Sequence, residues 1–181
     1  NRSGANIELL ERQLCSSDFF DAPASTRYHG AYRGGLCEHS LSVYDNLLEL
    51  NKSRNLNLDV DSMKIAALLH DFSKMNFYTT EIKNKKVYSE TGSKSDSMGR
   101  FDWQSVEGYV VRDLSARFVL ADHETTAAFM TNTFIPLTAE EYAAISNHHG
   151  GVGESSGVSA VKISEVFSTY PLALYVHIAD L

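Results

Sequence analysis

A histidine and an aspartate stand side by side at the end of an apolar run. Residues 65–69 are Ile, Ala, Ala, Leu and Leu, and His70 and Asp71 follow them. An apolar run of this density is typical of a buried helix. An ionisable pair costs several kcal/mol in such a place unless another group compensates it. Either the helix reaches the surface at this point, or the pair holds a metal ion or a charged partner.

The chain has seven histidines, and several of them lie near the ends of apolar segments. His177 and Asp180 are three residues apart and therefore share one face of an otherwise apolar helix. A single histidine is more often a structural residue than a metal ligand. A helical bundle, however, can focus His and Asp side chains from several helices on one site. Mixed imidazole and carboxylate ligands favour one or two divalent transition-metal ions (Mn, Fe, Co, Ni or Zn), and Mg is a further option.

The elements that must position these side chains are predicted to be helices. Asp59 or Asp61 can cap the helix that runs to the His-Asp pair. Thr138 with Glu141 matches a capping box, and Pro171 is a good first residue of the final helix. The predicted helices cover about residues 6–14, 36–53, 60–70, 122–134, 138–148 and 158–169, with a last one from 171.

Residues 76–111 break this helical pattern. The segments NFYTTEI and KVYSE favour strands and NKK between them favours a turn, so a β-hairpin is predicted. The polar segment TGSKSDSMGR is predicted as a loop, and VEGYVV as a further short strand. The sequence therefore predicts an all-α fold, a single-domain helical bundle over residues 1–181 with a small β-hairpin insertion at about 76–111.

Composition limits the class of protein. With 181 residues, 43% hydrophobic and 22% charged, the chain is that of an ordinary globular domain. The net charge of −7 argues against strong non-specific binding to a nucleic-acid backbone. Cys15 and Cys37 form no disulfide framework, and no signal peptide or membrane-spanning stretch is visible, so we expect free thiols and a cytoplasmic protein without a membrane partner. The chain starts without Met and stops within an apolar helical pattern, so we expect it to continue in a longer polypeptide.

The histidines and aspartates occur in an order that resembles the HD superfamily of metal-dependent phosphohydrolases. The segments FFDAPASTRYHGAYRGGLCEHSLSVY and LLHDFSK are similar to the branch that contains YhaM-type 3′–5′ exoribonucleases and their stand-alone HD homologues. The segments DHETTAAFMTNTFIPLTAEEYAAISNHHGG and YPLALYVHIADL continue the likeness, which covers about residues 18–181 and is weakest over 79–112. The resemblance implies an HD-domain helical bundle.

The resemblance also implies two metal positions. Asp71 would bridge them, and His149 would contribute to the second. Relatives often carry Gly-His-Gly where this chain has Asp122, His123 and Glu124, so either acidic neighbour can also reach the second metal. The implied ligands are His39, His70, Asp71 and Asp180 for the first metal, and Asp71, His123 and His148 for the second.

The implied site suits phosphoester hydrolysis by metal-activated water, with Asp71 and Lys74 as candidate catalytic residues. A metal lowers the pKa of bound water to about 7, and a second ion holds the phosphoryl oxygens. Lys74 is placed to neutralise a substrate phosphate, although a lysine there is equally typical of a helix C-terminus. Arg33 and His29 can add phosphate contacts, or His29 is only a structural hydrogen-bond partner. His177, one turn from the last implied ligand, can orient that carboxylate, a water or the substrate.

Two further patterns point to other functions. Residues 153–157, GESSG, match the G-x-S-x-G motif of α/β-hydrolases, but that motif needs a parallel sheet, which the sequence does not predict. Lys83, Lys85 and Lys86, with Tyr78 and Tyr88 nearby, can guide single-stranded nucleic acid by charge and stacking. Such a cluster is more often a solvated hairpin tip, and we expect one here.

Three classes of function remain. A hydrolase of nucleotides or other small phosphate compounds is favoured by the acidic net charge and by the lack of a visible nucleic-acid-binding domain. A 3′–5′ exonuclease on single-stranded RNA or DNA is favoured by the resemblance, but no OB-fold segment accompanies the domain. A metal-binding regulatory module with little turnover would have lost a ligand, and every expected position is filled. We therefore expect a hydrolase that cleaves a phosphoester bond in a small phosphate-containing molecule.

Overall fold

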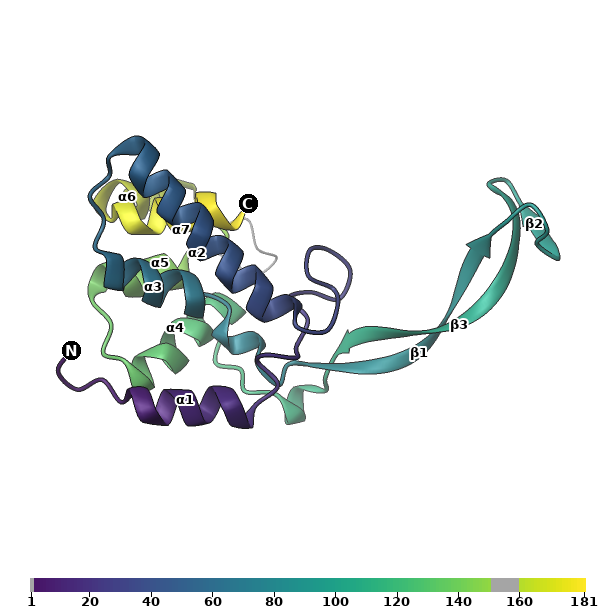
Figure 1. The fold of residues 1–181 in the computed structure, drawn as a ribbon, viewed down its shortest axis with the longest axis horizontal. Helices are drawn as coiled ribbons and strands as arrows, with labels where there is room; N and C mark the ends of the chain where they lie inside the picture. The colour runs from purple at the N-terminus through teal and green to yellow at the C-terminus, as the bar shows by residue number, and fades with distance from the viewer. Residues whose placement is uncertain (1, 151–159) are drawn as a thin grey trace.

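The computed structural model describes residues 2–150 and 160–181 of the chain. Within these residues the helices pack into one body, and a three-stranded sheet projects from it (Figure 1). Two short 3₁₀ helices, η1 (Phe72–Lys74) and η2 (Leu114–Ala116), lie on either side of the sheet in the sequence. The α-helices are α1 (Ile7–Ser16), α2 (Gly35–Arg54), α3 (Val60–Leu69), α4 (His123–Phe134), α5 (Ala139–Ser146), α6 (Ala160–Thr169) and α7 (Pro171–Asp180).

The helix starts follow the capping signals in the sequence. The Asp59 side chain accepts a hydrogen bond from the Ser62 N–H at the start of α3. Thr138 and Glu141 form a complete capping box at the start of α5. Pro171 is the first residue of α7. The predicted capping box of α5 and the prediction of Pro171 as the first residue of the last helix are confirmed, and of the two candidates for α3 the cap is Asp59.

The core of the body lies where α3 and α7 pack against α2 and α5. Ala66 and Ala67 on α3 and Ala173 on α7 are fully buried. Such small side chains let neighbouring helices approach closely, while Leu36 and Leu47 of α2 fill the remaining space. This close packing brings one end of α2, α3 and α7 to the same place, and these are the ends that carry His and Asp.

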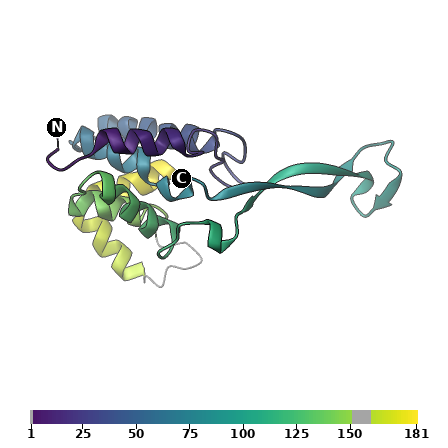
Figure 2. The same ribbon diagram turned by 90° about the horizontal axis from the view of Figure 1, so that it is seen from below.

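The sheet forms a long antiparallel arm, which we define as residues 78–111. Its strands are β1 (Tyr78–Tyr88), β2 (Lys94–Asp96) and β3 (Gly99–Val111), in the order β1-β3-β2. Figures 1 and 2 show the arm extending away from the helical body in both views. The predicted hairpin insertion is therefore present, but the fold is mostly helical rather than all-α.

The turn predicted at NKK is wrong. Asn84, Lys85 and Lys86 lie inside β1, opposite Ser105, Gln104 and Trp103 of β3. These polar residues find partners across the sheet: Ser105 Oγ donates to Asn84 Oδ1 (2.9 Å), and Lys86 Nζ donates to Asp96 (2.6 Å). The segment VEGYVV is the end of β3 and not a separate strand, and TGSKSDSMGR contains β2. The three lysines consequently lie along a strand and not at a hairpin tip.

Three further sequence expectations have structural outcomes. Cys15 and Cys37 are both free thiols. The helix expected at 138–148 already ends at Ser146, so the two histidines that follow belong to a turn. None of the helices in the described part of the chain has the length and apolar character needed to cross a bilayer. The GESSG motif at 153–157 lies outside the described residues.

Candidate metal centre

Four side chains from three helix ends meet beside the core. His39 comes from the first turns of α2, His70 and Asp71 directly follow α3, and Asp180 ends α7. His39 Nε2 lies 2.9 Å from Asp180 Oδ1 and 3.1 Å from His70 Nε2. Asp71 Oδ2 lies 3.4 Å from His70 Nε2 and 3.7 Å from His39 Nε2. The structure thus brings together the four residues implied for the first metal.

The charges at this centre are tightly balanced. Burial by itself lowers the pKa of His70, but the carboxylates of Asp71 and Asp180 outweigh burial and raise this pKa to about 10. Burial raises the pKa of Asp71, yet Lys74 and His70 hold it well below its ordinary value. The pKa of Asp180 is likewise lowered, because hydrogen bonds from His39 and His70 outweigh its burial. Two buried carboxylates stay ionised only beside positive charge or hydrogen-bond donors, which His39, His70 and Lys74 provide here; a bound metal ion would provide positive charge as well.

The buried histidines are oriented by backbone carbonyls. His70 Nδ1 lies 2.7 Å from the carbonyl oxygen of Ala67, and His148 Nδ1 lies 2.8 Å from that of Ile145. Because a carbonyl only accepts, Nδ1 carries the proton in each ring. Nε2 of each ring therefore faces the carboxylates: that of His70 lies 3.1 Å from His39 Nε2, and that of His148 has no hydrogen-bond partner. Such support of the outer ring nitrogen is usual for histidines that bind metals.

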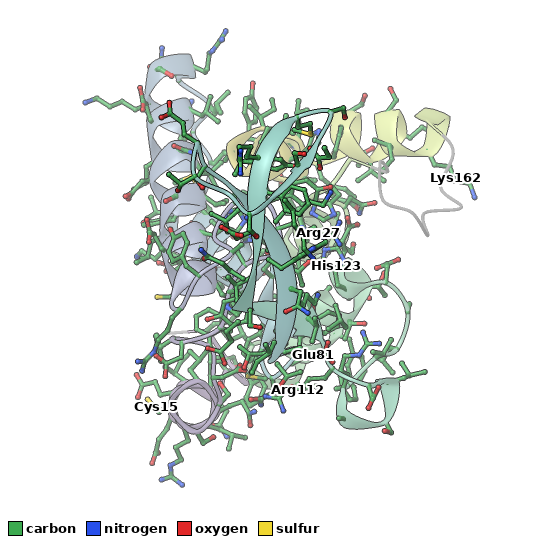
Figure 3. All side chains as sticks on the ribbon, turned by 90° about the vertical axis from the view of Figure 1, so that its right-hand side faces the viewer. Cys15, Arg27, Glu81, Arg112, His123 and Lys162 are labelled. Carbon is green, nitrogen blue, oxygen red and sulfur yellow. The ribbon has the colours of Figure 1, made fainter. Side chains whose placement is uncertain are left out.

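A second group of side chains meets the other oxygen of Asp71. Asp71 Oδ1 lies 3.6 Å from His148 Nε2 and 3.9 Å from His123 Nε2. His123 is the first residue of α4, and Figure 3, which looks along the arm towards the body, labels it. Burial lowers the pKa of His123 to about 4, so its imidazole is neutral at physiological pH.

The facing atoms of Asp71, His123 and His148 are buried without hydrogen-bond partners. Five buried side-chain nitrogen or oxygen atoms of the described residues have no partner, and Asp71 Oδ1, His123 Nε2 and His148 Nε2 are three of them. An unsatisfied buried polar atom costs roughly 1–3 kcal/mol. Three such atoms around one point, one carboxylate oxygen and two imidazole nitrogens, fit the ligand set of a divalent transition metal.

Glu124 and His149 complete this second group. His149 Nδ1 lies 3.0 Å from Glu124 Oε1, and this carboxylate raises the pKa of His149. The ligand atoms of His123, Glu124, His148 and His149 all lie within 4.8 Å of one another. Asp122 does not join them, because its side chain caps α4 by accepting from the Thr125 N–H (2.7 Å). Of the two acidic neighbours that the sequence offered, the structure brings only Glu124 to the group.

Lys74 is held at the centre by Asp71. Its Nζ lies 2.7 Å from Asp71 Oδ2, and the lysine side chain is only 11% exposed. Burial lowers the pKa of Lys74, but the Asp71 charge outweighs burial and raises it. Lys74 is therefore a charged partner of the central carboxylate as well as a neighbour of the substrate position expected there.

The remaining predicted residues lie at different distances from the centre. The His29 ring lies at the exposed side of the site, with its centroid 4.7 Å from that of His39 and the two ring planes tilted by 36°, and burial lowers its pKa. His177 Nδ1 lies 2.6 Å from the carbonyl oxygen of His148, so it supports the turn that carries this histidine. Arg33 pairs with Asp21 (3.0 Å) and its side chain is 79% exposed. The structure does not bring Arg33 into the cluster, and its expected phosphate contact gains no support.

Sequence reasoning missed the orienting carbonyls of Ala67 and Ile145. Each lies three residues before its histidine, at the end of a helix whose last carbonyls have no intrahelical partner. A histidine that lies three residues after one of the last carbonyls of a helix would have signalled this contact. The sequence shows such a histidine only when the exact end of the helix is known.

Comparison with known proteins gives one family and no individual relative. The model of the HD domain matches residues 36–180, which include every residue of the two groups described above. Neither a search of curated proteins nor a search of solved structures found a significant match. The YhaM-type branch is therefore unsupported, whereas the match over most of the chain shows that this protein belongs to the HD domain family, whose members are typically metal-dependent phosphohydrolases.

Proposed function

We propose that this protein is a metal-dependent phosphohydrolase that cleaves a phosphoester bond in a nucleotide or a related small phosphate compound. The observation that carries the proposal is the convergence of three unpartnered buried atoms, Asp71 Oδ1, His123 Nε2 and His148 Nε2. A purely structural cluster would leave their desolvation uncompensated.

The ligand roles follow from the two groups. Asp71 offers one oxygen to each group and is the natural bridge. When bound, the ions supply a water of lowered pKa and stabilise the charge of the phosphoryl oxygens. His and Asp ligands suit Mn, Fe, Co, Ni or Zn, and Mg is a weaker fit. We assign His39, His70, Asp71 and Asp180 to the first ion, and Asp71, His123 and His148 to the second, with Glu124 and His149 beside it.

The other residues prepare the site for a phosphate. Lys74 keeps Asp71 ionised and adds a positive charge next to the substrate position. His29, on the exposed side of His39, is placed to contact a substrate that enters there. His177 fixes the turn that carries His148. Lys74 therefore acts through its charge, and His29 and His177 act through their positions.

A second candidate, exonuclease activity on single strands, is favoured by a groove at the arm. Thr26 and Arg27 face Lys83, Lys85 and the end of β3 across a hollow of about 540 Å³. Among the residues that the structure describes, no acidic side chain forms an ion pair with Arg27, Lys83 or Lys85. The net charge of −7 nevertheless favours the small substrate, because it opposes a long anionic chain.

A substrate screen tests the proposal. The purified protein with Mn²⁺ is incubated with nucleotides, cyclic nucleotides, and short RNA and DNA. We expect hydrolysis of at least one nucleotide or cyclic nucleotide, and none by a parallel preparation of Asp71→Ala. Tight metal binding without turnover of any of these compounds would contradict the proposal and favour a regulatory module.

A double substitution separates the two candidate substrates. Replacing Arg27 and Lys85 with Ala removes two cations from the groove. Lys86→Ala is the control, because the Lys86 side chain points to the other face of β1 and pairs there with Asp96 of β2. For a small substrate we expect unchanged rates in all variants. Loss of cleavage of a short RNA by R27A/K85A, with unchanged hydrolysis of a mononucleotide, would favour the exonuclease.

A further inference from the structure

The arm exposes an open edge along β1. In the sheet β1 has β3 on one side and no strand on the other. The N–H of Arg112 bonds the carbonyl of Phe77, and the N–H of Ser89 bonds that of Arg100, so the odd-numbered residues of β1 face β3. The backbone N–H and C=O groups that point to the open edge therefore belong to the even-numbered residues, among them Thr80, Ile82, Asn84 and Lys86.

Apart from its three lysines, Lys83, Lys85 and Lys86, this edge lacks the features that keep strands from pairing. β1 is 11 residues long, contains no Pro, and pairs with β3 in one register without a bulge. Ile82 in its middle is 78% exposed. Away from its base, where Thr26 and Arg27 line a hollow with Lys83 and Lys85, the arm stands clear of the helical body (Figures 1 and 2). Long, exposed edges of this kind are templates for the addition of another strand.

The charges beside Ile82 make the edge complementary to itself. In an antiparallel pair of two β1 strands centred on Ile82, Glu81 of each copy lies opposite Lys83 of the other. These are non-hydrogen-bonded positions, where opposite residues come closest, with Cα atoms about 4.5 Å apart. Opposite charges placed in this way stabilise strand pairs, and like charges destabilise them.

The same charges make the neighbouring symmetric registers less favourable. Centring the pair on Lys83 places two lysines face to face between its two Glu81–Lys85 pairs, and centring it on Glu81 places two glutamates face to face with no opposite-charge pair. The backbone fits the Ile82 register, because Ile82 has its N–H and C=O at the open edge, and it fits the two neighbouring symmetric registers equally well. The charges, and not the backbone pattern, therefore select the Ile82 register.

We propose that the arm binds a second copy of this chain, with the two β1 strands paired antiparallel about Ile82. The two three-stranded sheets then form one continuous sheet around a twofold axis, which is the common symmetry of homodimers. Figure 3, which views the arm from its tip, labels Glu81 on β1. The interface does not involve the metal centre, so it stands or falls independently of the proposed phosphohydrolase function.

A charge swap tests this register. The mass of the full chain in solution is measured by light scattering or sedimentation over a range of micromolar concentrations. We expect the wild type to show twice the monomer mass of 20.1 kDa. Glu81→Lys and Lys83→Glu each replace two attractive pairs with repulsive ones, so each should weaken the dimer by about 10-fold or more. The double variant E81K/K83E restores opposite charges and should restore the dimer.

Lys94→Glu is the matched control for the charge change. Lys94 lies on β2, at the opposite edge of the arm, and its replacement should leave the dimer unchanged. A wild type that stays monomeric, or a dimer that neither single variant weakens, would overturn the proposal. A double variant that stays monomeric while its circular dichroism matches the wild type would overturn it as well.

A proline substitution tests whether backbone hydrogen bonds of β1 hold the two copies together. Ile82→Pro removes an N–H that faces the open edge but takes no donor from the β1–β3 ladder, and edge strands tolerate such a proline. We expect the variant to be monomeric with the arm still folded. A variant that still forms the wild-type dimer would show that the edge does not carry the association and would overturn the proposal.

Discussion

At the scale of single residues, the centre depends on how one carboxylate is shared. Asp71 Oδ2 lies next to His70 and Lys74, and Oδ1 lies next to His123 and His148. The first oxygen has a full cationic partner in Lys74, whereas the second has no hydrogen-bond partner. The two sides of the carboxylate thus differ, and the side of His123 and His148 is the one that most needs an ion.

Glu124 offers a test of that side. Glu124→Gln keeps an acceptor oxygen for His149 but removes the negative charge near His123 and His148. Residues that orient ligands typically contribute 10- to 100-fold to metal affinity. We expect E124Q to weaken binding of the second Mn²⁺ by roughly 10-fold. Calorimetric titration with Mn²⁺ of protein that a chelator has freed of metal measures this affinity.

Asp122→Asn is the control for this titration. It removes a negative charge on the other side of His123, and asparagine caps a helix as well as aspartate does. We expect wild-type affinity in D122N. Equal loss in both variants would mean that only the general negative charge matters and that Glu124 has no special position.

At the scale of elements, Glu141 joins three segments of the chain. It completes the capping box of α5, accepts from Ser62 of α3 (2.7 Å), and pairs with Arg2 before α1. Its side chain is fully buried. Burial raises its pKa, but the hydrogen bonds from Arg2, Ser62 and Thr138 outweigh burial and lower it to about 2.

This lowered pKa predicts a dependence of stability on pH. In the unfolded chain the Glu141 pKa is near the ordinary value of 4.5, so its contribution to stability is present above that pH. The contribution is lost as the pH falls through the range from 4.5 towards 2. Glu141→Gln should lower the free energy of unfolding at pH 7 by about 2–4 kcal/mol, because it leaves Arg2 without its partner.

Urea unfolding at pH 7 and at pH 3 measures both effects. The gap between wild type and E141Q should be large at pH 7 and smaller at pH 3, since the wild type has by then lost part of the contribution. An equal gap at both pH values would show that Glu141 acts through packing and not through its charge.

The helices could be predicted from sequence because each signal was local. The capping box of α5, the Asp59 cap of α3 and the apolar spacing before His70 depend on residues within one or two turns of each other. The arm could not be predicted in detail, because the partners of Asn84 and Lys86 are Ser105 and Asp96, 21 and 10 residues away. Local turn preference at NKK was overridden by these cross-strand contacts.

The candidate site was predictable only in part for the same reason. The set of histidines and aspartates was implied by the resemblance to HD-superfamily phosphohydrolases. The choice between Asp122 and Glu124 at the second group depended on where α4 starts. Asp122 is the N-cap of α4, and Glu124 is the second residue of the helix. Arg33 was an attractive phosphate ligand from its position, but Asp21 holds it on the surface.

At the scale of the whole molecule, the protein separates a helical body, which carries the candidate metal centre, from a projecting arm. The HD domain match runs through residues 36–180, and the arm is inserted between η1 and α4 (Figure 1). Because the arm begins four residues after Lys74, any partner bound at its base lies near the metal centre. The arrangement allows the arm to change without disturbing the helices that hold the ligands.

The central claim is that the His and Asp side chains hold metal ions that support phosphoester hydrolysis. The most direct measurement is hydrolysis of the substrate found in the screen by chelated protein, before and after addition of Mn²⁺, for wild type and Asp71→Ala in parallel. We expect no activity after chelation, recovery of the wild type with Mn²⁺, and at least about a 1000-fold lower rate for D71A, since the metals contribute several kcal/mol of transition-state stabilisation. Hydrolysis that survives chelation, or a D71A variant that recovers the wild-type rate, would contradict the account.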